Sequence, residues 1–246
     1  MASSLLAGLT ILMIGDSHLA TPDYLIKSLH DNLVQQGAQV HSLGICGANA
    51  GDWLKATPGT CGGAERRGTD KPVVLGSKAA TQPIGELIKA DKPDVVVVVM
   101  GDTMASYTKP AFPKAWLWQQ TTSFAKEIAN SGAKCVWVGP NWGTEGGKYG
   151  KTYARVELTS KFLAANVAPC DYIDSLKFSK QGEWATVDGQ HLTAPGYLTW
   201  SKKISEEIVK ALENAKVLLL VVTESAVRSH KVAKEVVLAS ERKGHI

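Results

Sequence analysis

Apolar residues along the chain fall into short continuous runs that alternate with amphipathic segments. The clearest run, Asp94 to Met100, is apolar at nearly every position and suits a parallel strand covered on both faces. Shorter runs predict further strands over residues 10–14, 38–43, 133–138 and 172–173. Because parallel strands need crossover helices between them, this alternation predicts an α/β domain with a mostly parallel sheet.

The segments between these runs have helical spacing. Leu25, Leu29 and Leu33 recur every four residues, which predicts a helix that Thr21 caps and that ends at Gly37. Further helices are predicted over residues 116–131, 153–165 and 193–212. Residues 48–83 are rich in Gly, Thr, Pro and charge, so we expect a long irregular loop of the kind that carries function.

The last 33 residues have a pattern of their own. Residues 216–223 predict a strand and residues 229–243 a helix, and the chain stops at Gly244-His245-Ile246, where another strand would begin. This C-terminal β-α extension faintly resembles the middle of a TIR-type domain. We expect a main domain over residues 8–213 and an extension over 214–246, which is either a truncated or fused fragment or an intrinsic extra strand.

Composition is that of a globular protein. The chain has 246 residues, 44% of them hydrophobic and 20% charged, with a formal net charge of +4. That charge is mild, and no basic stripe with interleaved aromatics accompanies it, so nucleic acid is not an expected partner. No apolar run reaches the length of a membrane span. The apolar start, Leu5 to Ile14, resembles a signal-peptide core but lacks a basic region before it.

Four cysteines bear on the cellular compartment. Cys46, Cys61, Cys135 and Cys170 fit no zinc motif, and we expect no metal site. Their even number permits two disulfides, with Cys46–Cys61 and Cys135–Cys170 as the pairs nearest in sequence, or four reduced thiols. If the bridges form, the protein is exported to a periplasm or secreted; otherwise it is cytoplasmic.

Chemistry is indicated first where the opening strand ends. Gly15-Asp16-Ser17-His18 places a serine after a buried strand and before a helix, and therefore at the carboxyl edge of the sheet. The alternative interpretation is a plain turn with Asp16 or Ser17 as a helix cap.

A base and its partner lie near the other end of the domain, in Asp188-Gly189-Gln190-His191. Imidazole accepts protons near neutral pH, and a carboxylate three residues earlier can fix its tautomer. A surface aspartate that caps the helix beginning at Thr193 is the alternative. We predict Ser17 as nucleophile, His191 as general base and Asp188 as the residue that orients it.

Two more blocks supply donors for a developing oxyanion. Gly47 follows the second strand and Thr103 the third, so the backbone N–H groups of Ser17 and Gly47 and the Thr103 side chain are expected to converge on one carbonyl oxygen. The substrate pocket is expected from loops 48–83, 104–114 and 140–151. Candidate substrate-binding residues in or near these blocks and loops are Asp16, Trp53, Asn141 and Trp142.

Taken in order, these blocks resemble the SGNH/GDSL hydrolase family over residues 8–212. The resemblance implies a flavodoxin-like three-layer α/β/α sandwich and acyl-ester chemistry without metal or cofactor. Ser17 matches the family nucleophile, Gly47 its oxyanion glycine, and Asp188 and His191 its Asp-x-x-His pair. Residues 139–142 resemble its fourth block.

One departure concerns the third block, where the family has Gly-x-Asn and this chain has Thr103. The resemblance implies that an asparagine amide normally completes the oxyanion hole. A threonine hydroxyl is shorter, so we expect weaker activity unless Asn49 or Asn141 substitutes.

The resulting hypothesis is a serine esterase that removes a small acyl group, acetyl above all, from an ester on a carbohydrate. Tryptophans near the loops suggest the sugar, because aromatic faces stack on sugar rings. One alternative is an O-acetyltransferase that passes the acyl group to a sugar hydroxyl. Another is an inactive carbohydrate-binding relative. No glycine-rich nucleotide motif stands in the required strand–loop–helix context.

Overall fold

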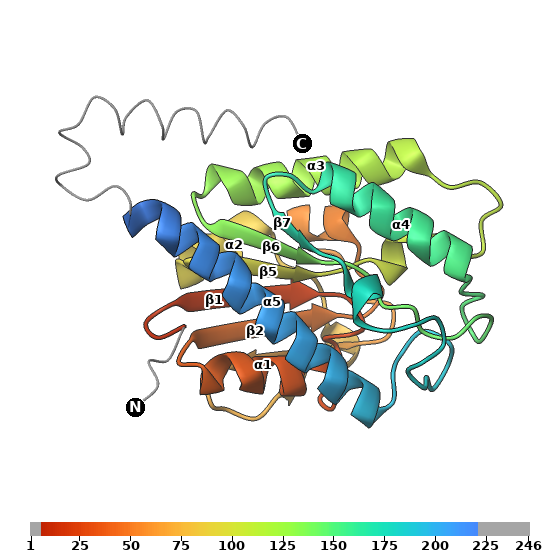
Figure 1. Ribbon diagram of the computed structural model, residues 1–246, viewed down its shortest axis with the longest axis horizontal. Coiled ribbons are helices and arrows are strands. Elements are labelled where there is room, and N and C mark those ends of the chain that lie inside the picture. Colours follow the sequence, from red (N-terminus) through yellow and green to blue (C-terminus); the bar gives the residue numbers. More distant parts are fainter. Residues whose placement is uncertain (1–5, 221–246) are drawn as a thin grey trace. The chain divides into compact units, whose positions relative to one another are not determined.

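The computed structural model describes residues 6–220, and in them seven strands form one sheet (Figure 1). The strands are β1 (Thr10–Gly15), β2 (Gln39–Ile45), β3 (Gly63–Arg67), β4 (Val73–Val74), β5 (Val95–Val99), β6 (Lys134–Val138) and β7 (Asp171–Ile173). Their order is β4-β3-β2-β1-β5-β6-β7. β2, β1, β5, β6 and β7 run parallel, and β3 and β4 are antiparallel additions at one edge. The predicted mostly parallel sheet is confirmed.

Helices cover both faces of this sheet. They are α1 (Leu25–Gln35), α2 (Ile84–Asp91), α3 (Lys114–Asn130), α4 (Tyr153–Asn166) and α5 (Ala194–Leu220), with 3₁₀ turns η1 (Ala50–Leu54), η2 (Gly76–Lys78), η3 (Asp102–Met104) and η4 (Ser175–Phe178). Figure 1 shows α1 and the first part of α5 in front of the strands, where Asn32 donates to Ser201 at 3.3 Å. α2, α3 and α4 contribute to the core on the other face, so the predicted three-layer α/β/α sandwich is confirmed.

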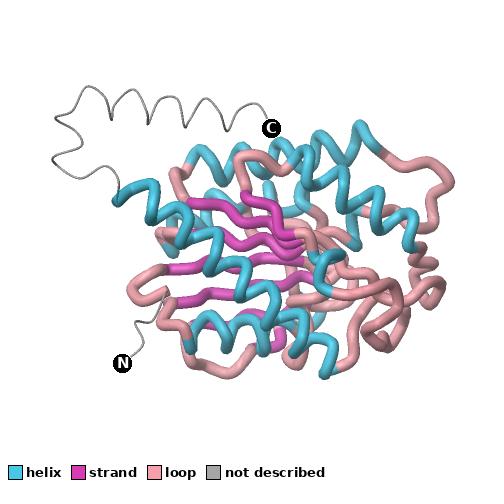
Figure 2. The backbone as a smooth tube through the Cα atoms, in the orientation of Figure 1, coloured by secondary structure: helices cyan, strands magenta, loops and turns pink. Residues whose placement is uncertain are grey.

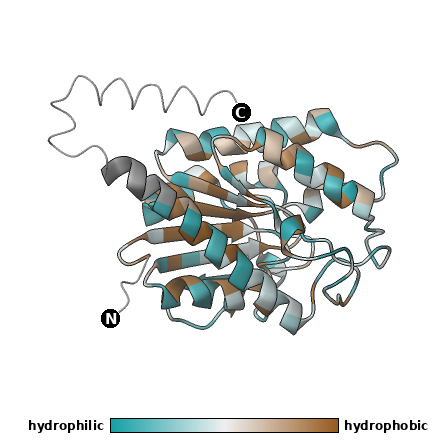
Figure 3. Cartoon of the chain, in the orientation of Figure 1, coloured by the Kyte–Doolittle hydropathy of each residue, from teal (hydrophilic) through white to brown (hydrophobic). Residues whose placement is uncertain are grey.

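The central strands are largely apolar, as the brown colouring of Figure 3 shows, and β5 is apolar at every position. All five valines of β5 are buried. Val96 and Val98 belong to the cluster that holds Phe124 of α3 and Trp137 of β6, whose rings meet edge to face. A strand buried on both faces by such residues leaves little freedom of register, so the loops that leave it are fixed in place.

The functional edge of the sheet follows from strand order. β1 lies between β2 and β5, and Gly15 pairs with Val99, so the segments after β1 and β5 leave the sheet side by side. The order of strand addition reverses at this point, since β2 lies on one side of β1 and β5 on the other, and open α/β sheets bind their ligands at such a switch. Figure 2 shows long loops gathering at the carboxyl ends of the strands.

Residues 48–83 correct one prediction, because they are not one irregular loop. They contain η1, β3, β4 and η2, and β3 extends the sheet by pairing with β2. The sequence of β3, Gly-Ala-Glu-Arg-Arg, shows no apolar alternation because a buried arginine takes an inward position. Arg66 is satisfied there by an ion pair with Asp31 at 2.7 Å and by the Asp70 carbonyl at 2.7 Å.

Two helix predictions also need correction. α1 begins at Leu25, not after Thr21, because residues 18–24 are occupied by turns in which Tyr24 donates to Thr21 and Leu25 to His18. The predicted strand 216–223 is wrong over 216–220, where α5 continues to Leu220. No glycine or proline lies between Gly196 and Leu220 to end the helix. The rest of that strand and the helix 229–243 lie outside the described residues, and the TIR-type resemblance gains no support.

Of the two alternatives for the cysteines, the structure has the two disulfides rather than four reduced thiols. Cys135 of β6 is joined to Cys170, which precedes β7, and Cys46 after β2 is joined to Cys61 before β3. Each bridge therefore ties neighbouring segments of the sheet. The chain divides into two compact units, one ending at Glu207 and the next beginning at Ile208. Within residues 6–220, no helix is both long and apolar enough to cross a bilayer.

Candidate active site

Ser17 lies in a tight turn directly after β1. Leu19 donates to the Asp16 carbonyl at 3.0 Å and Ala20 to the Ser17 carbonyl at 3.2 Å, which turns the chain back over the end of the strand. The Asp16 carboxylate also accepts the backbone N–H of His18 at 3.0 Å. The serine is thus held at the carboxyl edge of the sheet, with 7% of its surface exposed.

The structure brings the three predicted catalytic residues together across 174 positions of sequence. The Ser17 hydroxyl lies 2.7 Å from Nε2 of His191, and Nδ1 of His191 lies 2.7 Å from Oδ2 of Asp188. The other oxygen of Asp188 accepts the backbone N–H groups of Gln190 at 3.0 Å and His191 at 2.8 Å. One carboxylate therefore holds both the ring and the backbone of the histidine, which leaves Nε2 free to accept a proton from the serine.

Burial and hydrogen bonding set the charges of this triad. Burial lowers the pKa of His191 below its ordinary value of 6.5, and nearby His18 lowers it further, while Asp188 offsets part of this shift. Burial alone would raise the pKa of Asp188, but its hydrogen bonds from His191 and Gln190 outweigh that effect and lower it. At neutral pH the site therefore contains a neutral imidazole beside an ionised carboxylate, which is the state that activates a serine.

Aromatic rings enclose the imidazole of His191. Tyr24 stacks on it with ring centroids 5.7 Å apart, and Tyr149 meets it edge-on at 5.7 Å. Tyr149 belongs to a glycine-rich loop, residues 143–150, in which Lys148 donates its backbone N–H to the carbonyl of Asp188 at 2.9 Å. The loop that precedes α4 is therefore tied to the loop that carries the histidine.

Two backbone donors face the region in front of the Ser17 hydroxyl. Among residues 6–220, neither the N–H of Ser17 nor that of Gly47 donates to a protein acceptor. Gly47 has φ +81°, and a Cβ there would lie 2.3 Å from Oγ1 of Thr60, so the position requires glycine. The Cys46–Cys61 disulfide fixes the segment on either side of it. These free N–H groups are the kind of donor that an oxyanion hole uses.

The third predicted donor is committed elsewhere. The hydroxyl of Thr103 donates to the carbonyl of Ala48 at 2.8 Å and lies 3.4 Å from Asp16. Asn49 does not substitute, because its side chain caps η1 through Gly51 and contacts Asp52. Asn141 is fully buried and does not line the cavity described next. Of the three predicted oxyanion donors, the N–H groups of Ser17 and Gly47 are thus available and the Thr103 hydroxyl is not.

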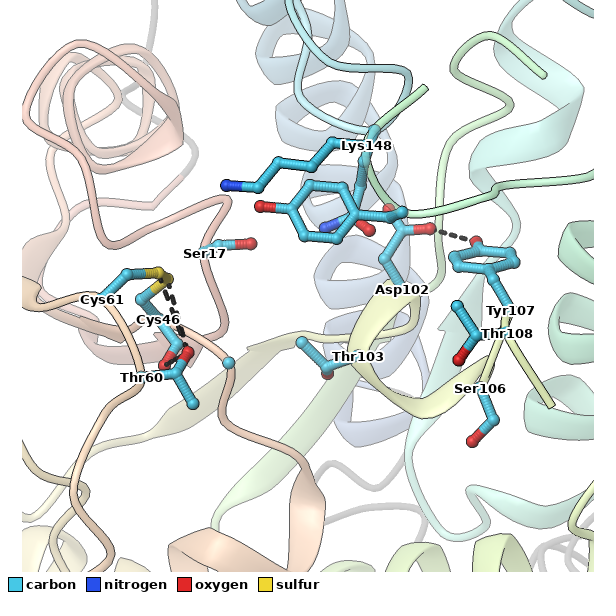
Figure 4. A pocket seen from close by; sticks show the side chains of 13 residues that line it. Ser17, Cys46, Thr60, Cys61, Asp102, Thr103, Ser106, Tyr107, Thr108 and Lys148 are labelled. Atoms are coloured by element: carbon cyan, nitrogen blue, oxygen red, sulfur yellow. Dashed lines mark hydrogen bonds between the residues drawn. A yellow bond between two sulfur atoms is a disulfide. The ribbon is translucent and has the colours of Figure 1, made fainter. Parts of the chain in front are cut away.

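A cavity of about 280 Å³ opens beside Ser17 (Figure 4). It is lined by Ser17, Cys46, Gly47, Thr60, Cys61, Asp102, Thr103, Ser106, Tyr107, Thr108, Lys148, Tyr149 and Gln190. Seven of these thirteen residues come from the three loops that the sequence indicated, and the others follow β1, β2 and β5 or precede His191. In Figure 4 the serine side chain lies between the Cys46–Cys61 disulfide on one side and Asp102 and Tyr107 on the other. Seven of the thirteen residues carry side-chain hydroxyls, and no Ala, Val, Leu or Ile is among them.

The four predicted substrate-binding residues do not line this cavity. Trp53 is fully buried in the hydrophobic core, so its ring is not available to a sugar. Asp16 is fully buried beneath the serine turn, and burial raises its pKa. Asn141 lies in the interior, and Trp142 donates its ring N–H to the Leu176 carbonyl at 2.9 Å.

Sequence reasoning missed several cavity residues, chiefly Tyr107, Lys148 and Tyr149. They lie in the loops 104–114 and 140–151, which the sequence predicts as parts of the pocket without singling out these side chains. Four glycines of the run 143–150 have positive φ and shape a compact loop. The sequence gives no sign of which side chain of such a loop faces the serine.

A curated relative fixes the family. Protein BcsX of Komagataeibacter xylinus is 41% identical over 217 residues, a match that covers 87% of this chain and 82% of BcsX. The chain belongs to the BcsX family. No family model matches it.

Solved structures share the fold at low identity. A GDSL-like lipase from Bacteroides thetaiotaomicron superposes with a TM-score of 0.52 at 13% identity, covering 82% of this chain and 88% of the lipase. Esterase EstA of Pseudoalteromonas gives 0.53 at 15%, covering 83% and 98%. A catalytic mutant of Axe2, an acetylxylan esterase from Geobacillus stearothermophilus, gives 0.51 at 14%, covering 82% and 94%. This member of the BcsX family therefore has the fold of the SGNH/GDSL hydrolases.

Proposed function

We propose that this chain is a serine esterase that removes a small acyl group, acetyl above all, from a hydroxyl-rich alcohol such as a carbohydrate. The observation that carries the proposal is the pair of 2.7 Å contacts that align Ser17, His191 and Asp188 beside a cavity. The names of the structural neighbours, an esterase and an acetylxylan esterase among them, support an acetyl ester.

The proposed reaction passes through an acyl-serine. Nε2 of His191 accepts the proton of Ser17 as the serine oxygen bonds to the acyl carbon. The N–H groups of Ser17 and Gly47 bind the oxyanion, and Asp188 stabilises the imidazolium. His191 then gives its proton to the leaving alcohol. Water, deprotonated by His191, next attacks the acyl carbon, and Ser17 leaves with the proton as the carboxylic acid is released.

The lining of the cavity supports the substrate class. Six of its side chains besides Ser17 carry hydroxyls, and the Cys46–Cys61 disulfide lines it as well. A long acyl chain would find no aliphatic surface to replace the water it loses, whereas a sugar finds hydrogen-bonding partners. A small acyl group on a polar alcohol therefore fits best. The two disulfides support export to an oxidising compartment as the place of action.

The test is hydrolysis of p-nitrophenyl acetate and of an acetylated oligosaccharide by the full chain. Wild type should release nitrophenol and acetate, and Ser17→Ala should release neither above background. Thr108→Val, a cavity substitution outside the triad, serves as the matched control and should keep the p-nitrophenyl acetate activity. Release that persists in folded Ser17→Ala would overturn the proposal, and acetate appearing on an added sugar acceptor would redirect it to acyl transfer.

A further inference from the structure

A second histidine–carboxylate pair is buried directly behind the proposed nucleophile, and the mechanism above does not use it. His18 follows Ser17 in sequence and is 2% exposed. Its Nε2 lies 2.9 Å from Oδ2 of Asp102, and its Nδ1 lies 2.8 Å from the hydroxyl of Tyr197. Its ring centroid is 5.2 Å from that of His191. We call His18, Asp102, Lys151 and Tyr197 the His18 network.

Lys151 completes this network as a fully buried cation. Its ammonium group lies 2.9 Å from Oδ1 of Asp102 and donates to the Asn141 carbonyl at 2.9 Å. Tyr107 donates to the same carboxylate oxygen. Burial alone would raise the pKa of Asp102, but Lys151 and His18 hold it well below its usual range. Buried charges are costly unless they are paired and hydrogen-bonded, and here both conditions are met.

The network connects the two segments that carry the proposed triad. His18 is joined to the serine turn by the chain itself, while Tyr197 on α5 stacks on Tyr24 with ring centroids 4.3 Å apart, and Tyr24 in turn stacks on His191. Lys151 closes the glycine-rich loop whose Lys148 donates to Asp188. The Asp102 carboxylate is therefore connected through His18 to the Ser17 turn and through Lys151 to the loop that contacts Asp188.

We propose that His18 is a positioning residue for this site. His18 is held between Asp102 and Tyr197, and Lys151 balances the charge of Asp102. In this position His18 fixes the Ser17 turn against the His191 turn. The inference rests on the proposed function. It matters because a displacement of about 1 Å between reacting groups lowers a rate by about 10²-fold.

The same chain offers a control in a histidine that is equally buried and also makes two hydrogen bonds, but to groups outside the site. His30 on α1 is fully buried, with Nδ1 2.6 Å from the Ser42 hydroxyl and Nε2 2.7 Å from the Gly68 carbonyl. Replacing either histidine removes two buried hydrogen bonds. If His18 positions the site, its replacement should slow the reaction of Ser17, whereas replacement of His30 should not.

The experiment measures how fast a fluorophosphonate modifies Ser17. In that reaction the serine oxygen bonds to phosphorus, fluoride leaves, and His191 accepts the serine proton, so the rate reports the activated hydroxyl without an ester substrate. The second-order rate constant is measured at 25 °C for the wild type, His18→Leu, His18→Gln and His30→Leu. Circular dichroism melting in the same buffer establishes that each variant is folded.

We expect His18→Leu to be modified about 10²-fold more slowly than wild type. His18→Gln retains a donor toward Asp102 and should recover to within about tenfold, whereas His30→Leu should stay within about threefold. With p-nitrophenyl acetate, His18→Leu should lower kcat and leave KM within about twofold, since the cavity lining is intact. A structural role alone would move melting temperatures of both leucine variants and neither rate.

If His18→Leu does not fold, Tyr197→Phe supplies the same test by deleting one hydroxyl, and it should slow modification by about three- to tenfold. A folded His18→Leu or Tyr197→Phe that reacts as fast as wild type would overturn the positioning role while the proposed esterase stands. A wild type that no fluorophosphonate modifies would overturn the proposed function itself, and the inference with it.

Discussion

Thr103→Asn tests whether the oxyanion hole works with two donors. The threonine hydroxyl donates to the Ala48 carbonyl at 2.8 Å, so its proton is not available to an oxyanion. One added oxyanion donor is worth about 10²–10³ in kcat, or about 2.7–4 kcal/mol. Losing the bond to Ala48 costs about 0.5–1.5 kcal/mol. If the lost bond weakens the positioning of the new donor by that amount, the expected net gain in kcat is about 10- to 100-fold.

The assay is the kcat for p-nitrophenyl acetate at pH 8, with Thr103→Val as the control. Valine keeps the shape of threonine and removes the hydroxyl, so kcat should stay within about twofold while the melting temperature falls slightly. A folded Thr103→Asn that is no faster than wild type would refute the reasoning. A loss of tenfold or more in Thr103→Val would show instead that the hydroxyl turns toward the oxyanion during the reaction.

Three further predictions concern the base, the oxyanion loop and the second disulfide. Only neutral His191 accepts the serine proton, so kcat/KM should rise with pH. Because burial lowers the pKa of His191, half of the maximum should be reached below pH 6.5, and a midpoint above 7 would contradict this. Gly47→Ala should lower kcat by about 10² or more, since its Cβ meets Thr60; unchanged kcat would remove Gly47 from the oxyanion hole. Cys135→Ser/Cys170→Ser should lose about 2–4 kcal/mol of stability in urea unfolding with kcat retained; an unchanged midpoint would show that the bridge contributes nothing.

Much of the fold follows from local pattern. The run of valines identifies β5 because the strand is buried at every position. The four-residue leucine spacing identifies α1 because those leucines form its buried face. β3 was missed because its inward position is filled by Arg66, whose burial depends on Asp31 from another element. The short helix α2 has too few turns to show a clear period. Residues 216–220 were wrongly predicted as part of a strand because a run of leucines and valines suits a strand and a helix alike.

Less of the site could be predicted. Ser17, Asp188 and His191 stand in motifs whose spacing already implies their roles, and their separations match that expectation. Nothing in the sequence distinguishes the buried Lys151 from a surface lysine, because its burial depends on Asp102, which lies 49 positions away. Tryptophans were favoured as sugar platforms, yet Trp53 serves the core. Tertiary packing decides whether such a side chain lies in the core or lines the cavity.

The central claim is that Ser17 carries the acyl group. The most direct measurement mixes the protein with p-nitrophenyl acetate, quenches it in acid within the first turnovers, and locates the added mass by peptide mapping. The account predicts one acetyl group on the peptide that contains Ser17, its absence in Ser17→Ala, and its accumulation in a variant that cannot deacylate. Nitrophenol release with no acetyl on Ser17, or with the same adduct in Ser17→Ala, would contradict the account.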